Sequence, residues 1–139
     1  MKKKKALRIL VVDDNPTNLK LISDLLTFEG YEIERAVDAR EAEQALAKSH
    51  PDLVLLDIAL PGMDGLTLTR KLRENPVTQN LCIIALTASA MRGDEDKARE
   101  AGLDGYITKP INTRLLPQQI KDIMKCGWRG KAPSEKTRS

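Results

Sequence analysis

The sequence is poor in aromatic residues, cysteine and histidine. Phe, Trp and Tyr together make up 3% of the 139 residues, and His50 is the single histidine. Cys82 and Cys126 match no metal-binding or redox spacing, so we expect two reduced thiols rather than a disulfide. His50 falls in a predicted turn with no nucleophile or metal ligand near it in sequence, which argues against a histidine-based site.

The chain also has no long apolar run. The apolar stretch after the N-terminal lysines is interrupted by Arg8 and is too short for a signal peptide or a membrane span. We therefore expect a soluble, cytoplasmic protein. The length suits one domain, which would bury roughly two-thirds of the surface that the unfolded chain exposes.

The net charge of +3 is distributed unevenly along the chain. Lys2 to Lys5 carry +4, and residues 125–139 carry five basic side chains against Glu135, which leaves −5 for residues 6–124. Short basic ends can hold nucleic acid or an anionic membrane, but they are more often solvated extensions. We expect no specific nucleic-acid partner and no membrane partner.

Composition and pattern predict three parts of the chain. These are a basic extension over residues 1–6, one folded domain over residues 7–126 and a flexible basic tail over residues 127–139. Trp128 is the one large apolar group in the tail. It can fold back onto the last helix or anchor a partner, and the sequence leaves both readings open.

Five apolar segments of strand length alternate with helical patterns. The predicted strands are Arg8–Val12, Tyr31–Ala36, Leu53–Leu56, Leu81–Leu86 and Gly105–Thr108. The predicted helices start at Pro16, after Asp38, before Leu66, at Met91 and near Pro117. This alternation predicts an α/β fold in which a five-stranded parallel sheet has right-handed crossovers and helices on both faces.

Capping residues mark several of the predicted helix ends. Asn15 and Pro16 suit the N-cap and first helical position, and Asp38 with Glu41 forms a capping box. Pro117 cannot donate to an interior helical bond, so we expect the last helix to begin near it, after an irregular turn capped by Asn112.

Polar residues follow four of the five predicted strands directly. They are Asp13 and Asp14 after the first strand, Asp57 after the third, Thr87 after the fourth and Lys109 after the fifth. Because the carboxyl ends of parallel strands meet at one edge of a sheet, these side chains should converge. Asp57 could instead cap the next helix, but Asp64, just before Gly65, is better placed for capping.

Three converging carboxylates repel one another unless a cation lies among them. Oxygen ligands without cysteine or histidine point to Mg²⁺, which keeps open positions for phosphate oxygens. Lys109 and Thr87 would complete a site that stabilises a transferred phosphoryl group, with Asp57 as the nucleophile.

The chain resembles the receiver domain of two-component response regulators over roughly residues 7–125. The resemblance is carried by Asp13-Asp14, Asp57 with Leu60-Pro61-Gly62-Met63-Asp64-Gly65, Thr87-Ala88 and Lys109-Pro110, in this order and spacing. It implies a flavodoxin-like sheet of order 2-1-3-4-5. It also implies that Asp57 accepts a phosphoryl group from a sensor histidine kinase or a histidine phosphotransfer protein.

The resemblance further implies roles for the individual site residues. Asp14, Asp57 and the backbone carbonyl of Ala59 bind Mg²⁺ directly, and Asp13 acts mainly through water. In the family, the residue at the position of Ala59 also tunes how long the phosphate survives.

Other residues carry the response to phosphorylation in the family. Lys109 pairs with the phosphoryl group, and Thr87 moves to form a hydrogen bond with it. Tyr106 turns inward. Ala88 belongs to the same site. The bond between Lys109 and Pro110 is cis in the family, which the sequence alone does not establish.

The output of such a domain would be a protein contact. No helix-turn-helix or catalytic pattern follows the last predicted helix, so the chain resembles the stand-alone receivers of cell division and chemotaxis. We expect a downstream protein to bind the face around residues 91–101, Tyr106 and residues 112–124. On this reading the chain is not an enzyme, although it promotes its own phosphoryl transfer and slow dephosphorylation at Asp57.

Three other classes fit the sequence less well. A phosphatase of the haloacid-dehalogenase kind needs a second aspartate two residues after Asp57, where Ala59 stands, and a cap domain. A dinucleotide-binding module is excluded because the loop after the first strand is Asp-Asp-Asn-Pro, which would repel phosphate in the absence of a metal ion. An interaction module that carries no phosphate is disfavoured by the intact Asp57, Thr87 and Lys109.

Overall fold

The computed structural model describes residues 7–58, 65–87, 100–108 and 111–126. Five strands form one parallel sheet in the order β2-β1-β3-β4-β5, as the flavodoxin-like prediction required. The strands are β1 (Arg8–Val12), β2 (Glu32–Ala36), β3 (Leu53–Asp57), β4 (Cys82–Thr87) and β5 (Gly105–Thr108). The helices are α1 (Pro16–Phe28), α2 (Ala39–Lys48), α3 (Gly65–Glu74) and α5 (Leu116–Cys126). The predicted helix from Met91 lies outside the described residues except for its last two positions.

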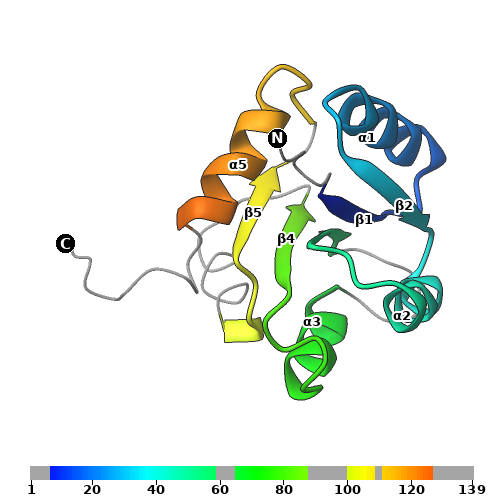
Figure 1. Cartoon of the computed structure of the whole chain (residues 1–139), viewed down its shortest axis with the longest axis vertical. Coiled ribbons are helices and arrows are strands. Elements are labelled where there is room, and N and C mark those ends of the chain that lie inside the picture. Colours follow the sequence, from blue (N-terminus) through cyan, green and yellow to red (C-terminus); the bar gives the residue numbers. More distant parts are fainter. Residues whose placement is uncertain (1–6, 59–64, 88–99, 109–110, 127–139) are drawn as a thin grey trace, which may run out of the picture.

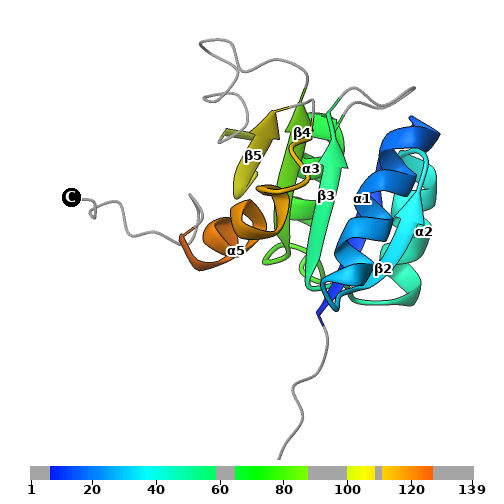
Figure 2. The ribbon, with the colours of Figure 1, turned by 90° about the horizontal axis from the view of Figure 1, so that it is seen from above.

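The helices form a layer on each side of the sheet. Figure 1 shows α1 and α5 on one side and α2 and α3 on the other, and Figure 2 shows the same arrangement from above. Every second residue of a strand faces the same layer, so Leu55 packs with α1 and α5 while Leu56 packs with α2 and α3. Each such side chain contributes about 1.5–3 kcal/mol when fully buried. All of β3 is buried, which makes it the centre of both cores.

Local signals place the helix starts where the sequence predicted them. The Asn15 side chain accepts hydrogen bonds from the backbone N–H groups of Thr17 (2.9 Å) and Asn18 (3.1 Å). Asp38 accepts from the Glu41 N–H at 2.9 Å. The return bond of this capping box differs from the ideal pattern, because the Glu41 carboxylate accepts from the N–H of Val37 instead of Asp38.

The last helix also begins as expected. Asn112 caps the irregular turn, since its side chain accepts from the N–H groups of Arg114 (3.0 Å) and Leu115 (3.3 Å). The helix then starts at Leu116, one residue before Pro117. Leu116 and Ile120 are fully buried against the sheet, so the predicted apolar stripe holds α5 in place.

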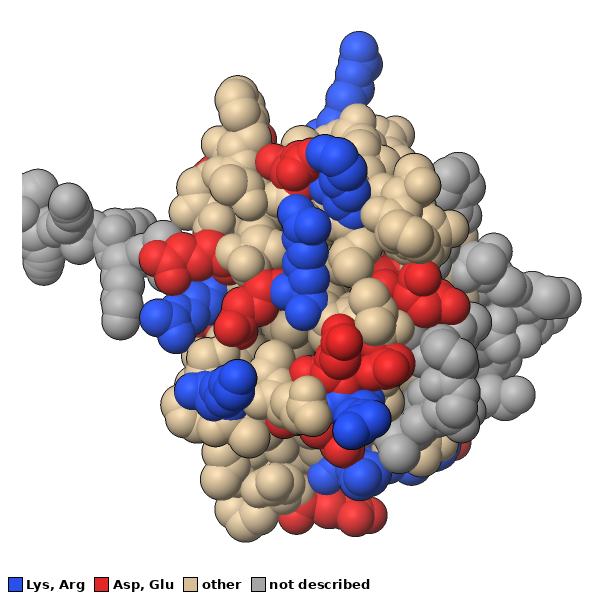
Figure 3. Space-filling model, turned by 90° about the vertical axis from the view of Figure 1, so that its right-hand side faces the viewer, with Lys and Arg blue, Asp and Glu red and all other residues tan. Residues whose placement is uncertain are grey.

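Exposed charges of both signs are mixed on the side formed by α1, β2 and α2. Figure 3 shows no large area of one sign there. Asp24 pairs with Lys20 at 2.7 Å, and this bond lowers the pKa of the Asp24 carboxyl. Such exposed pairs add little stability. In the described residues, no helix combines the length and the hydrophobicity that crossing a membrane requires.

Candidate functional site

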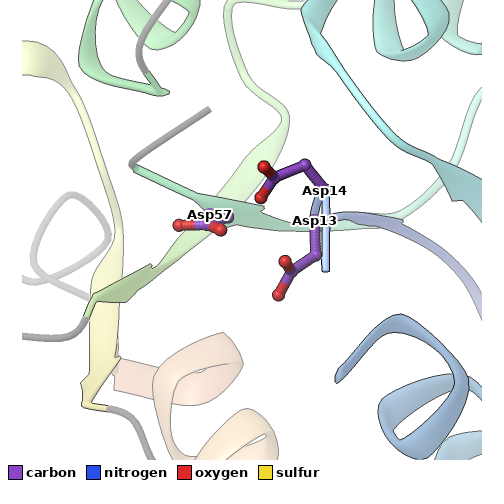
Figure 4. A group of neighbouring side chains, drawn as sticks. All are labelled: Asp13, Asp14 and Asp57. Atoms are coloured by element: carbon purple, nitrogen blue, oxygen red, sulfur yellow. The ribbon is translucent and has the colours of Figure 1, made fainter. Parts of the chain in front are cut away.

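Three carboxylates meet at the carboxyl edge of the sheet. Oxygen atoms of Asp13, Asp14 and Asp57 lie within 4.8 Å of one another, and Figure 4 shows the three side chains at the ends of β1 and β3. Asp13 is 0% exposed, Asp57 is 5% exposed, and Asp14 is open to solvent. These residues are neighbours because β1 pairs with β3, with Val12 opposite Leu56.

Backbone bonds hold Asp13 in its position. Its N–H donates to the carbonyl of Ala36 at the end of β2 (3.1 Å), which prolongs the β1–β2 pairing. Its carboxylate accepts from the N–H of Asn15 at 2.9 Å. Because Asn15 is also the N-cap of α1, the same turn that starts the helix orients this acid.

The backbone at Asp57 is held by pairing with β4. Asp57 is the last residue of β3 and lies opposite Leu86 of β4. The next residue, Ile58, donates its N–H to the Leu86 carbonyl (3.1 Å), so the strand pairing continues past Asp57. The Asp57 backbone is therefore fixed on both sides of its own position.

The three acids fit a small divalent cation. Carboxylates this close repel one another, and two of them are shielded from water, so a cation between them is strongly favoured. The donor set consists of oxygen atoms only, which suits Mg²⁺. Because Asp14 is exposed, one side of the cluster remains open to solvent and to a phosphate group.

Thr87 and Tyr106 lie on neighbouring strands at the same edge. Tyr106 is paired in register with Ala85, and Thr87, two residues after Ala85, lies on the same face of the sheet. Both residues are half-buried. Thr87 is also one residue beyond Leu86, the partner of Asp57, which places it beside the acidic cluster.

Three predicted site residues are not placed by the structure. Ala59, Ala88 and Lys109 lie outside the described residues. The residue before the lysine, Thr108, ends β5 directly opposite Thr87. The roles predicted for Ala59, Ala88 and Lys109 therefore stay predictions.

One cavity lies at the opposite edge of the sheet. Its volume is about 460 Å³, and it lies between the C-terminal ends of α2 and α3, with Leu46, His50, Lys71 and Val77 among its lining residues. The mixed lining includes no carboxylate of the acidic cluster. The cavity therefore does not belong to the site formed by Asp13, Asp14 and Asp57.

The close packing of Gly65 beside Asp57 was not predicted from the sequence. Gly65 was assigned only to a motif, whereas the structure packs it against the backbone at Asp57 and Ile58. A glycine at the start of a helix, soon after a strand that ends in an acid, was the available signal.

The family of the chain follows from comparison with known proteins. Residues 9–121 match the model of the response regulator receiver domain. The chain belongs to this family. It is a receiver domain of two-component signalling and works as a phosphoacceptor switch.

Individual relatives agree with this assignment. The polar-differentiation response regulator DivK of Brucella ovis is 39% identical over 116 residues, which cover 84% of this chain and 94% of DivK. The response regulator PleD of Caulobacter vibrioides is 40% identical over 116 residues, and the match spans 84% of this chain but only 26% of PleD. The receiver domain of the sensor histidine kinase PA1611 from Pseudomonas aeruginosa is 31% identical with a TM-score of 0.78, and the match covers 88% of this chain and all of that domain. That crystal structure holds a magnesium ion in its active site cleft.

Membership of the family sets the general character of the protein. Receiver domains are signalling switches rather than conventional enzymes, and they bind Mg²⁺ at an acidic pocket. They interact with histidine kinases or phosphotransfer proteins and with downstream targets.

Proposed function

We propose that Asp57 is the phosphoacceptor of this receiver domain. The supporting observation is its place at the end of the buried central strand, with its carboxylate within 4.8 Å of those of Asp13 and Asp14. Its backbone is held by β4, because Asp57 lies opposite Leu86 and the N–H of Ile58 donates to the Leu86 carbonyl. Asp57 is also reached from solvent on the side of Asp14.

The transfer is a displacement at phosphorus. A carboxylate oxygen of Asp57 attacks the phosphorus of a phosphohistidine, the P–N bond breaks, and the imidazole nitrogen leaves with the electron pair and takes up a proton. The product is an aspartyl phosphate. The protein thus promotes its own phosphorylation, and slow hydrolysis of the acyl phosphate resets it.

Mg²⁺ would be held by Asp14, Asp57 and the Ala59 carbonyl, with Asp13 acting through water. When bound, the ion supplies positive charge that offsets the repulsion between the acids and the incoming phosphoryl group. Lys109 would pair with the phosphoryl oxygens on the other side, and Ala88 would line the same site.

Phosphorylation would change the surface through Thr87 and Tyr106. Drawing the Thr87 hydroxyl to the phosphoryl group vacates space, and the Tyr106 ring on the same face of the sheet can fill it. A few kcal/mol of differential interaction suffice to make a minor state dominant, and hydrogen bonds to phosphate supply that range. The partner face would comprise residues 91–101, Tyr106 and residues 112–124.

Intact mass measurement after incubation with acetyl phosphate tests the acceptor. We expect the gain of one phosphoryl group with Mg²⁺ and none with chelator, and we expect Asp57→Asn to abolish the gain. Asp52→Asn is a matched control, because Asp52 is an exposed acid just before the other end of β3. A mass gain that persists in Asp57→Asn would refute the assignment.

Amide NMR spectra with fluoroberyllate, which stands in for the phosphoryl group, test the switch. We expect shifts concentrated in residues 87–116. Shifts confined to residues 33–48 would contradict the proposed route through Thr87 and Tyr106.

A further inference from the structure

Gly65 lies in direct contact with the backbone of the proposed phosphoacceptor. An ideal Cβ atom at Gly65 would be 2.8 Å from the carbonyl oxygen of Asp57 and 2.8 Å from the Cα of Ile58. Cβ atoms essentially never come closer than 3.0 Å to other heavy atoms, so a side chain here would force a shift. Both obstructing atoms belong to the main chain, so side-chain rotation cannot relieve the clash.

Glycine is required at position 65 because of its close approach to the backbone of Asp57 and Ile58, not because of its own backbone conformation. Gly65 is the first residue of α3, and its φ is not in the left-handed region, unlike that of Gly30 or Gly102. Alanine would suit the helical backbone at least as well as glycine. The conformation of Gly65 therefore tolerates a side chain, whereas the space beside Asp57 does not.

Hydrogen bonds join Gly65 to Ile58 and to Thr69. Its N–H donates to the Ile58 carbonyl at 2.7 Å. Its carbonyl accepts from the hydroxyl of Thr69, which is completely buried, also at 2.7 Å. Since Leu68 and Leu72 bury α3 against the sheet, the helix cannot simply move away from the strand end.

We propose that Gly65 is a positioning residue for phosphoryl transfer, which rests on the proposed function of Asp57. The first turn of α3 packs against the main chain where it leaves β3 and so fixes the backbone position of Asp57. The backbone position in turn fixes where the Asp57 carboxylate lies relative to those of Asp13 and Asp14. Mg²⁺ demands near-ideal octahedral geometry. Even a slight displacement of the Asp57 backbone therefore has two effects: it weakens Mg²⁺ binding, and it misplaces the attacking carboxylate oxygen.

Gly65→Ala tests this role by two measurements. Mg²⁺ affinity is measured by titration without phosphodonor, and the phosphorylation rate is measured with acetyl phosphate. In that reaction the phosphoryl group passes to an Asp57 oxygen while acetate leaves with the electron pair of the broken P–O bond. Because misplacement of a reacting group is costly, we expect a rate loss on the order of tenfold or more and a clear loss of Mg²⁺ affinity.

Gly30→Ala is the matched control for a glycine-to-alanine change. A Cβ at Gly30 meets nothing within 4 Å, but the positive φ of 102° makes the substitution destabilising. Gly30 also lies at the other end of the domain, just before β2. We expect Gly30→Ala to lower stability while both site measurements stay within about twofold of the parent. If folded Gly65→Ala, checked by circular dichroism, matches the parent in both measurements, the proposal is overturned.

Thr69 provides a milder second test should Gly65→Ala not fold. Thr69→Val keeps the shape but removes the hydroxyl that holds the Gly65 carbonyl, whereas Thr69→Ser keeps the hydroxyl. We expect both site measurements to fall in the valine variant and to recover in the serine variant. Equal behaviour of the two variants would count against the positioning role. If the parent protein takes up no phosphoryl group, the proposed function fails, and Mg²⁺ titration still decides the role of Gly65.

Discussion

The guanidinium of Arg73 donates to the carboxylate of Asp104 across 3.0 Å, although the two residues are 31 positions apart. The same Asp104 oxygen accepts the Ile83 N–H at 2.8 Å, and Arg73 Nε donates to the Gly102 carbonyl at 2.9 Å. The two charged side chains are only 13% and 9% exposed. This pair ties the end of α3 to the starts of β4 and β5, the strands that carry Thr87 and Tyr106.

Arg73→Ala should therefore destabilise the domain strongly. Removing one partner of a buried ion pair leaves an uncompensated charge and unpaired carbonyls, at a cost of about 3–5 kcal/mol. Urea denaturation measures the free energy of unfolding. Arg70→Ala, an exposed arginine on the same helix, should change it by less than about 0.5 kcal/mol. If both substitutions change the free energy of unfolding equally, the buried pair of Arg73 and Asp104 adds no more stability than an exposed arginine does.

Gly102→Ala should cost more stability than Gly30→Ala. Both glycines have φ near 100°, where a side chain costs about 1–2 kcal/mol. A Cβ at Gly102 would also lie 2.7 Å from Cγ of Arg73, whereas one at Gly30 meets nothing within 4 Å. Thermal unfolding of the two variants compares them directly. A Gly102→Ala variant as stable as Gly30→Ala would mean that Arg73 adapts without loss.

Mg²⁺ should raise the thermal stability of the protein. A ligand that binds only the folded state adds about 1.4 kcal/mol at ten times its dissociation constant. Asp14→Asn should reduce this gain, because Asp14 belongs to the acidic cluster. Asp52→Asn should retain it. The prediction fails if chelator and Mg²⁺ give the same unfolding temperature, or if Asp14→Asn responds as the parent does.

Stability should decline at alkaline pH partly through Tyr31. Burial, with a smaller effect of the Glu29 charge, raises the pKa of Tyr31 above its ordinary value of 10.0. Folding therefore favours the protonated phenol, so this contribution is complete below about pH 10 and is lost as the pH rises through the raised pKa. Tyr31→Phe should flatten the fall in urea midpoint above pH 10. An unchanged slope in that variant would rule Tyr31 out as the cause.

Local patterns were enough to predict the five strands and the four described helices, and where several of these elements begin or end. The cap at Asn15, the first helical proline at Pro16 and the positive φ of Gly30 depend on contacts within a few residues. The apolar run that ends at Asp57 likewise predicted a buried strand that stops at an acid. These features follow from sequence because the groups that satisfy one another are close along the chain.

Local patterns predicted which residues lie at the carboxyl edge, because every strand of a parallel sheet ends there. Which of these residues become neighbours depends on the order of the strands in the folded sheet. Asp13 and Asp57 are neighbours because β1 pairs with β3, a choice made by the packing of both sheet faces together. The contact of Gly65 with the Asp57 backbone depends on how closely the start of α3 packs against the end of β3, and the pairing of Arg73 with Asp104 depends on how α3 meets β4 and β5. Neither distance follows from local propensity.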